Sequence, residues 1–242
     1  MKTSEYIVFT INRLPKGYVF TYADFITEVN KKEAIIKALN RMTASGKIVK
    51  LAKGKYYKPE TTTFGNLQPN LYQIVKDLLE DNGKIAGYLT GYSIYNQLGL
   101  TTQVSSIIQI GRNEIRPSLI RERYTISFIR QKNTITKDNI PLLQLLDAIR
   151  YIKKIPDTTN GAAVKRLLAI ISGLKESELR TLARLASKYP PATRALTGAM
   201  LQEVGEISMT EVLRKSLNPI TTYKLSGIAN NISSIQNWNI IE

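Results

Sequence analysis

The third helical segment of the chain constrains its fold more than any other feature. Residues 31–44 place apolar side chains at i, i+3, i+4 and i+7, which is the spacing of one buried stripe on an α-helix. The stripe consists of Ile35, Ala38, Leu39 and Met42. A helix with one apolar side has to cover that side with other elements. We therefore predict a helix over residues 31–44 that packs on elements close to it in the sequence.

Two more helical segments and one strand are predicted before this helix. A helix over residues 3–13 ends at a turn that contains Pro and Gly, because neither residue continues a helical hydrogen-bond ladder. The apolar, β-prone run 18–20 then predicts a short strand. Thr21 followed by Asp24 resembles a capping arrangement, which predicts the start of a second helix over residues 22–29.

Two short β-rich segments follow the third helix. KIVKL and KYYKP flank Ala52-Lys53-Gly54, and Gly54 suits the positive φ of a hairpin turn. Three helices followed by a basic hairpin describe a winged helix-turn-helix. In that arrangement the third helix enters the major groove, while the hairpin reaches phosphate or the minor groove. The sequence therefore predicts a DNA-binding domain of this type over residues 1–60.

Positive charge is concentrated around this helix and hairpin. The chain carries 34 Lys and Arg against 19 Asp and Glu, a net charge of +15, and residues 31–58 hold nine basic side chains against one acid. Such a basic segment makes nucleic acid the first partner to consider. A lysine taken alone, such as Lys31, Lys32 or Lys37, is equally well explained as a solvated side chain. The order of the elements is the more specific signal.

The candidate DNA-binding residues lie on the polar face of the third helix and in the hairpin. They are Lys32, Glu33, Lys37, Asn40, Arg41, Lys53 and Lys55. Asn suits adenine, Arg suits guanine, and Glu can accept a hydrogen bond from cytosine, so the helix can read base edges. The hairpin lysines suit phosphate, which positions a protein on DNA without reading its sequence.

Composition excludes much of ordinary enzyme chemistry. The chain has no cysteine and no histidine, which excludes disulfides, thiolate nucleophiles, zinc ribbons and imidazole bases. No Asp or Glu has a Lys two residues later, as the usual metal-dependent nuclease signature requires, and both phosphate-binding glycine motifs are missing. We predict a protein that is not an enzyme and has no metal site and no cofactor.

The chain also lacks the usual membrane signals. Its N-terminus shows no secretory signal, and no run approaches the ~18 consecutive apolar residues of a membrane span. We therefore expect a cytoplasmic protein without a membrane partner.

The rest of the chain is predicted as a second domain, over residues 70–242, so that the whole chain is α+β. A strand-rich part covers 84–136, a helical layer covers 140–217, and a polar tail covers 218–242. The segment TTTFGNLQPN near 61–70 is predicted to link the two domains, because it is rich in turn-forming residues.

Three tyrosines mark the strand-rich part. Tyr88, Tyr92 and Tyr95 can stack on bases, but their spacing favours a place in a core. Thr90 is predicted to cap a short helix that contains the second and third of them and ends at Gly99.

The pattern from residue 140 onward is helical. Helices are predicted over 175–188 and 191–204, and Ser208 with Glu211 forms a capping-box pattern before a last short helix. Trp238 lies in an apolar-polar alternation that predicts an edge strand or an anchor for the tail. The basic residues of this part are interpreted as a solvated face, with a second nucleic-acid surface as the alternative: Lys153, Lys154, Lys165, Arg166, Arg180 and Arg184.

The succession KGYVFTYADF, ALNRMTASGKIVKLAKGKYYKPE and GYLTGYSIYNQLGLTTQ resembles the AbiEi family, the antitoxins of abortive-infection toxin–antitoxin operons. The resemblance runs from about residue 6 to residue 125 and continues more weakly into the helical part. It implies an N-terminal winged helix that binds inverted repeats in its own promoter and a C-terminal domain needed for antitoxicity. It also implies a functional partner, a nucleotidyltransferase toxin encoded beside the antitoxin. The long polar tail after residue 217 departs from many members of that family.

Three functions remain open on the sequence. The first is an antitoxin and transcriptional autorepressor, for which the resemblance assigns DNA reading to Lys37, Asn40 and Arg41, with Lys53 and Lys55 in the wing. The second is a DNA-binding regulator of unrelated genes, which the adjacent gene and the operator distinguish from the first. The third is a protein-interaction scaffold whose charge is incidental, and such a scaffold shows no sequence-dependent binding to DNA.

Overall fold

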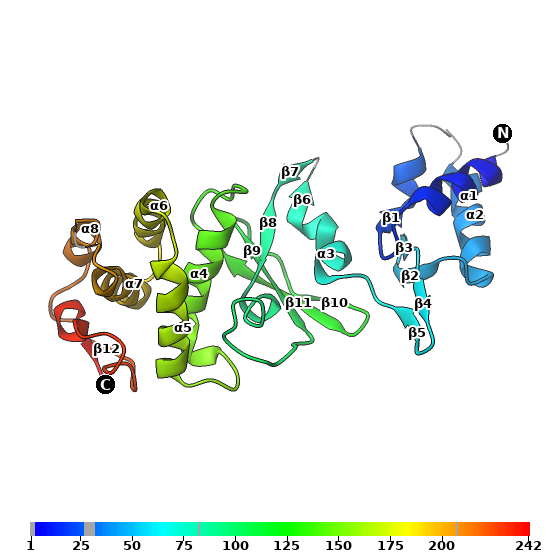
Figure 1. The fold of residues 1–242 in the computed structure, drawn as a ribbon. Coiled ribbons are helices and arrows are strands. Elements are labelled where there is room, and N and C mark those ends of the chain that lie inside the picture. Colours follow the sequence, from blue (N-terminus) through cyan, green and yellow to red (C-terminus); the bar gives the residue numbers. More distant parts are fainter. Residues whose placement is uncertain (1–2, 27–31, 82, 207) are drawn as a thin grey trace. The chain divides into compact units, whose positions relative to one another are not determined.

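The computed structural model in Figure 1 describes residues 3–26, 32–81, 83–206 and 208–242. The chain divides into two compact units. Unit 1 comprises Met1–Asp77 with Ile120–Tyr124, and unit 2 comprises Leu78–Leu119 with Thr125–Glu242. Both helices and sheets are present, which confirms the α+β class predicted from the sequence. The change from the first unit to the second falls within a helix, whereas the sequence predicts a linker before that helix.

Unit 1 alternates short helices with short strands. In chain order its elements are α1 (Thr3–Arg13), β1 (Val19–Thr21), the 3₁₀ helix η1 (Tyr22–Phe25), α2 (Lys32–Ala44), β2 (Val49–Ala52), β3 (Lys55–Tyr57), β4 (Glu60–Thr62), β5 (Gly65–Leu67) and most of α3 (Leu71–Leu79). Residues 27–29 of the helix predicted over 22–29 lie outside the described residues. The segment near 61–70 contains most of a two-stranded antiparallel hairpin, β4–β5.

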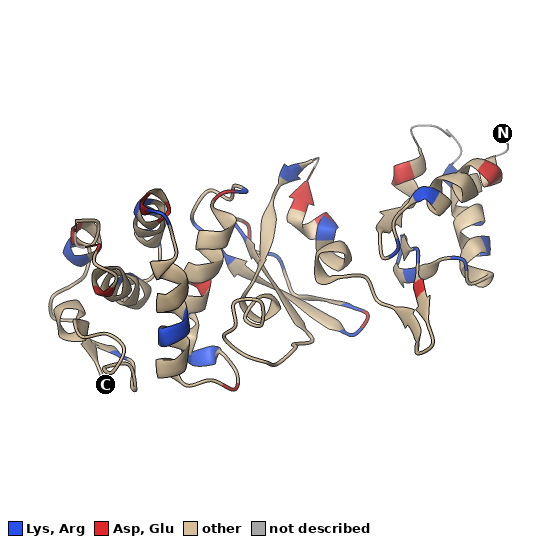
Figure 2. Ribbon diagram, viewed as in Figure 1, with Lys and Arg blue, Asp and Glu red and all other residues tan. Residues whose placement is uncertain are grey.

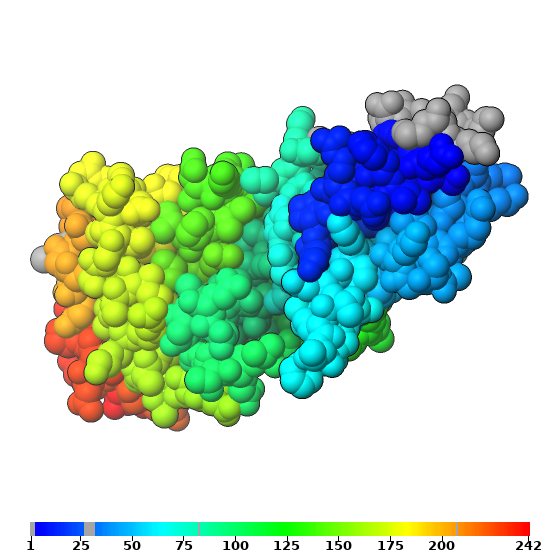
Figure 3. Space-filling model, turned by 45° about the vertical axis from the view of Figure 1, so that its right-hand side comes forward, coloured from blue at the N-terminus to red at the C-terminus, as the bar shows by residue number. Residues whose placement is uncertain are grey.

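The core of unit 1 forms around the predicted stripe of α2. Ile35, Ala38, Leu39 and Met42 are all buried, together with residues of α1 and β1, which confirms the stripe. Helices α1 and α2 are in contact, and the space-filling view in Figure 3 shows them in dark and lighter blue. Burying one face of α2 leaves its opposite face for solvent or a partner.

A three-stranded antiparallel sheet in the order β1-β3-β2 completes the core. Phe20 of β1 lies opposite Tyr56 of β3, and their rings are stacked with their centroids 6.3 Å apart. The predicted cap between Thr21 and Asp24 is confirmed, because the Thr21 backbone N–H donates to Asp24 Oδ2 at 2.6 Å and the Thr21 hydroxyl accepts from Ala23 N. Strands β2 and β3 form the predicted basic hairpin.

Unit 2 begins with a sheet. Its first elements are β6 (Glu80–Asp81), β7 (Lys84–Ile85), β8 (Gly87–Thr90), the 3₁₀ helix η2 (Gly91–Ser93) and β9 (Ile107–Arg112). Strands β10 (Leu119–Arg121) and β11 (Tyr124–Arg130) follow, and the segment Ile120–Tyr124, which connects them, belongs to unit 1. The four-stranded sheet has the order β10-β11-β9-β8, in which β9 runs antiparallel to β8 and parallel to β11. The parallel pair brings the C-terminal ends of β9 and β11 to the same edge.

A helical layer follows the sheet. It consists of α4 (Ile140–Arg150), the 3₁₀ helix η3 (Ile152–Lys154), α5 (Asn160–Ser172), α6 (Glu176–Ala186), α7 (Pro191–Glu203) and α8 (Glu211–Lys215). Helix α4 contacts strand β8 as well as helices α6 and α7, so it connects the sheet to the layer (Figure 1). The helices predicted over 175–188 and 191–204 are confirmed as α6 and α7.

The last elements of the chain include one that packs against α7. They are β12 (Tyr223–Lys224), the 3₁₀ helix η4 (Ile235–Trp238) and β13 (Ile240–Ile241), and β12 pairs in parallel with β13. The Trp238 side chain is buried against Gly198 of α7, and its indole Nε1 donates to Gln202 Oε1 at 2.8 Å. The predicted anchor for the tail is therefore confirmed.

Two capping predictions in unit 2 are wrong. Thr90 precedes a single 3₁₀ turn, η2, and its hydroxyl does not cap that turn but donates to the Asp147 carboxylate at 2.7 Å. Helix α8 begins at Glu211 with Thr210 at the N-cap position, so Ser208 lies too early in the chain to cap it. The prediction for the tyrosines is confirmed: Tyr88 and Tyr95 are buried, and Tyr92 packs against the same core.

No helix in the described ranges is long and apolar enough to cross a membrane.

Candidate nucleic-acid interface

The solvent face of α2 carries the helical part of the predicted interface. It is opposite the buried stripe, and Figure 2 shows basic residues along this helix. Its predicted members are all exposed: Lys32, Glu33, Lys37, Asn40 and Arg41. Lys31 lies outside the described residues. The helix therefore presents guanidinium, ammonium, amide and carboxylate groups on one side, which are the groups that recognise base edges and phosphates.

Asn40 connects this face to the hairpin. The buried Tyr56 of β3 donates its hydroxyl hydrogen to Asn40 Oδ1 at 3.2 Å. This bond orients the amide, and Oδ1 keeps a second lone pair while Nδ2 keeps its two hydrogens as donors. Recognition of adenine uses one donor and one acceptor of such an amide. The orientation of Asn40 is therefore set by the protein before a partner binds.

Arg41 and Lys32 also make contacts within unit 1. The Arg41 Nε donates weakly to the Lys37 carbonyl oxygen, one turn earlier, at 3.4 Å. The Lys32 ammonium lies 5.0 Å from the centre of the Tyr22 ring, within the range of a cation–π interaction. Both side chains still have exposed polar groups, because long basic side chains pack their stems while their heads stay in water.

The two hairpin lysines have different surroundings. Lys53 is exposed at the turn, where Gly54 adopts the predicted positive φ of 73°. The side chain of Lys55 is only 18% exposed, and its Nζ lies 2.9 Å from Asp77 Oδ2. Lys53 is thus placed to approach a phosphate directly, whereas Lys55, the first residue of β3 after the turn, holds that end of the hairpin to helix α3.

The Asp77 carboxylate forms ion pairs with two cations in unit 1. Besides Lys55, the Arg121 guanidinium forms a two-pronged pair with the Asp77 carboxylate, at 2.8 and 3.2 Å. Burial opposes the ionised form of Asp77, but the hydrogen bonds and charges of Arg121 and Lys55 outweigh it and lower the pKa of this carboxyl below its ordinary value. The sequence did not reveal this cluster, because its members are far apart in the chain.

One lysine of the basic segment has a structural role that the charge count does not reveal. The Lys58 ammonium donates to the carbonyl oxygens of Asn12 and Leu14, at 2.7 and 3.1 Å. These carbonyls lie at the C-terminal end of α1, where helices leave acceptors unsatisfied and attract positive charge. Part of the local basic excess therefore stabilises the fold of unit 1.

Comparisons with known proteins give one family and one similar structure. A family model described as a family of unknown function, DUF6088, matches residues 6–179. The search of curated proteins gives no match. A crystal structure of the RV2827C protein from Mycobacterium tuberculosis is similar, with a TM-score of 0.52, 14% sequence identity, and coverage of 98% of this chain and 90% of that chain. At this identity the likeness concerns the fold alone.

Proposed function

Because this chain belongs to DUF6088, a family of unknown function, we propose its function from its own residues: unit 1 binds double-stranded DNA in a sequence-dependent manner. We further propose that the protein is the antitoxin and autorepressor of a toxin–antitoxin operon. The observation that carries the DNA-binding proposal is the exposed face of α2, with Lys37, Asn40 and Arg41, beside a hairpin that ends in Lys53.

The arrangement of unit 1 supports a winged helix-turn-helix. Helical segments α1, η1 and α2 precede the β2–β3 hairpin, and β1 pairs with β3 as the third strand of its sheet. In such a domain α2 is the recognition helix and the β2–β3 hairpin is the wing. The Tyr56–Asn40 hydrogen bond joins these two elements, so they approach DNA as one rigid surface.

The charges of the interface divide into reading and positioning roles. Arg41 and Asn40 read base edges, Glu33 accepts from cytosine, and the lysines of α2 contact phosphate. Lys53 contacts phosphate or the minor groove from the wing. Lys55 acts mainly by holding the wing against α3 through Asp77.

The antitoxin part of the proposal rests on the three sequence motifs that resemble AbiEi antitoxins. It assigns DNA binding at inverted repeats of the promoter to unit 1 and antitoxicity to unit 2, with a nucleotidyltransferase toxin from the same operon as the functional partner. We expect the adjacent gene to encode a protein that stops growth when expressed alone and permits growth when this chain is co-expressed. Growth arrest that persists on co-expression contradicts the antitoxin role and leaves a regulator of unrelated genes.

Binding to the promoter is tested by titrating the full chain against its own upstream DNA and a scrambled duplex of equal length, at two salt concentrations. We expect the native duplex to bind more tightly at both, because base contacts survive screening better than phosphate contacts do. Equal, strongly salt-sensitive binding to both duplexes contradicts sequence reading. No binding at all favours the interaction scaffold.

Arg41→Ala is expected to weaken binding to the promoter by ~1–3 kcal/mol and to relax its sequence preference, because a bidentate contact to guanine is lost. Competition titrations with the native and scrambled duplexes measure both effects. The matched control is Arg184→Ala, which removes one exposed arginine from unit 2. Equal losses on the two duplexes would show that Arg41 does not read a base.

Lys53→Ala is expected to weaken binding to all duplexes by a similar factor. Loss of one phosphate contact also reduces the slope of log K against log salt by about one unit. The slope is measured over a salt series with wild type, Lys53→Ala and Lys165→Ala, the last of which removes an exposed lysine of α5. An unchanged slope in Lys53→Ala means that the wing does not contact phosphate.

A further inference from the structure

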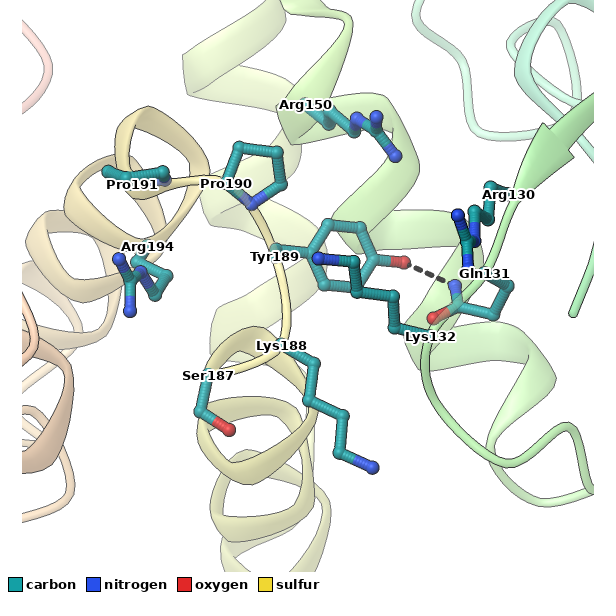
Figure 4. Close-up of a pocket in the computed structure, with 10 residues that line it drawn as sticks. All are labelled: Arg130, Gln131, Lys132, Arg150, Ser187, Lys188, Tyr189, Pro190, Pro191 and Arg194. Carbon is teal, nitrogen blue, oxygen red and sulfur yellow. Dashed lines mark hydrogen bonds between the residues drawn. The ribbon is translucent and has the colours of Figure 1, made fainter.

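Unit 2 contains a hollow of about 640 Å³ whose lining is strongly basic. It lies where three segments end or begin: strand β11 with the residues after it, the C-terminal end of α4, and the connection from α6 to α7 (Figure 4). Its charged lining residues are Arg130, Lys132, Arg150, Lys188 and Arg194. Asp and Glu are missing from its lining.

Among the described residues these five cations form no ion pairs, and only Arg150 is near enough to the buried Asp147 for their charges to interact. The Arg150 guanidinium lies 5.0 Å from the Tyr151 ring, which supports its position without neutralising it. The Nε of Arg194 is buried and has no hydrogen-bond partner within the described ranges. Like charges around one hollow repel each other, so an anion bound there would stabilise all five.

A buried network fixes the floor of the hollow. Gln131 Nε2 donates to the hydroxyl oxygens of Tyr189 and Tyr88, at 2.8 Å each, and the bond to Tyr189 is drawn in Figure 4. Both hydroxyls in turn donate to the Asp147 carboxylate, at 2.9 Å from Tyr189 and 2.7 Å from Tyr88. Each hydroxyl therefore has one donor and one acceptor partner.

The network also fixes the residues that neighbour three of the cations in the chain. Gln131 Oε1 accepts from the backbone N–H of Asn133 at 2.8 Å, so both ends of the Gln131 side chain are held. Arg130 and Lys132 flank this fixed residue, while Lys188 precedes the fixed Tyr189. A site whose supporting groups are ordered before binding loses less conformational entropy when a ligand arrives.

We propose that this hollow binds a small molecule that carries a run of phosphate groups, of the nucleoside polyphosphate or inorganic polyphosphate class. Arginine matches phosphate with two parallel hydrogen bonds and lysine adds a point charge, so three arginines and two lysines suit more than one phosphate group. The volume falls within the ~300–1,000 Å³ that is typical of small-molecule sites. Its residues all belong to unit 2 and differ from those of the DNA-binding face that we propose on α2.

The experiment uses the full chain and isothermal titration calorimetry at about 150 mM salt, where loosely held charges are screened. The probes are ATP, inorganic triphosphate, adenosine and a single-stranded oligonucleotide. We expect ATP and triphosphate to bind and adenosine not to bind. In a Lys132→Gln, Lys188→Gln double variant, affinity should fall about tenfold or more, because two charge-assisted contacts are lost. Both lysines are exposed, so the fold should tolerate the changes.

Two control variants separate this site from general charge effects. Lys165→Gln on α5 and Lys84→Gln on β7 each remove an exposed lysine elsewhere in unit 2 and should leave triphosphate binding unchanged. The proposal is overturned if neither phosphate probe binds or if the controls lose as much affinity as the double variant. Binding of the oligonucleotide alone, lost in the double variant, also overturns it and identifies a nucleic-acid backbone as the occupant.

Discussion

Replacement of Asp147 by alanine is expected to lower the free energy of unfolding of unit 2 by about 3 kcal/mol. The Asp147 side chain is 1% exposed and accepts hydrogen bonds from Tyr88, Thr90 and Tyr189. Hydrogen bonds to a charged group contribute ~1.5–3 kcal/mol each, and part of this is offset by the cost of burying the carboxylate. Urea unfolding followed by circular dichroism measures the loss. Asp138→Ala, at an exposed position, is the matched control and should change stability little.

The pH dependence of stability is a second test of the role of Asp147. Burial raises the pKa of Asp147, and the hydrogen bonds from Thr90, Tyr88 and Tyr189 and the charge of Arg150 offset this only in part. A carboxyl whose pKa is higher in the folded state than in the unfolded state stabilises the fold at pH values below its unfolded-state pKa. This contribution is lost as the pH rises through its folded-state pKa. Wild type should therefore lose stability relative to Asp147→Asn as the pH rises above about 4. A difference that does not vary with pH would contradict this account.

Trp238→Ala is expected to cost about 3–5 kcal/mol, because truncating a fully buried aromatic side chain removes its packing and leaves a cavity. The indole is 1% exposed against α7 and also loses its hydrogen bond to Gln202. Trp238 is the sole tryptophan, so unfolding has to be followed by circular dichroism rather than by its fluorescence. The control is Ile220→Ala, whose side chain is 88% exposed. A loss below about 1 kcal/mol would show that the tail is not anchored there.

A substitution at Gly198 tests whether the Trp238 indole is the group that packs against α7. A Cβ added at Gly198 would overlap Trp238 Cζ3, so Gly198→Ala has to displace the ring. We expect Gly198→Ala to destabilise the wild type but to be tolerated once Trp238 is alanine, because the two residues are in contact and their effects are not additive. Additive effects would mean that Gly198 acts through something other than the indole.

Features set by neighbours in sequence were predicted well. The stripe of α2 follows from a spacing of three and four residues, the Thr21–Asp24 cap from a spacing of three, and the β2–β3 hairpin from a glycine between two β-rich runs. Each depends on contacts within one helical turn or across one tight turn. The Ser208–Glu211 pattern has the same local form, yet it is wrong because the N-cap of the helix is Thr210, two residues after Ser208.

Features that depend on distant parts of the chain were not visible. The buried bonds to Asp147 join residues 42 to 59 positions apart, and the pair between Arg121 and Asp77 spans 44. The basic residues singled out in the helical part, such as Lys165 and Arg184, are exposed, which fits both a solvated face and a second nucleic-acid surface. The hollow is lined by other cations, which the C-terminal ends of β11 and α4 bring together. The density of charge along a sequence does not show that the ends of two distant elements lie side by side.

The ion pairs of the Asp77 carboxylate make the stability of unit 1 depend on pH. It joins the hairpin strand β3, through Lys55, to the segment Ile120–Tyr124, through Arg121. Protonation leaves two cations side by side without the anion between them, so attraction turns into repulsion. Because the pKa of Asp77 is lowered, this contact is retained into mild acid and is lost as the pH falls through that lowered value. Acid should therefore release the turn end of the hairpin from α3 before it disturbs the apolar packing under α2, whose buried members among the described residues include no carboxylate.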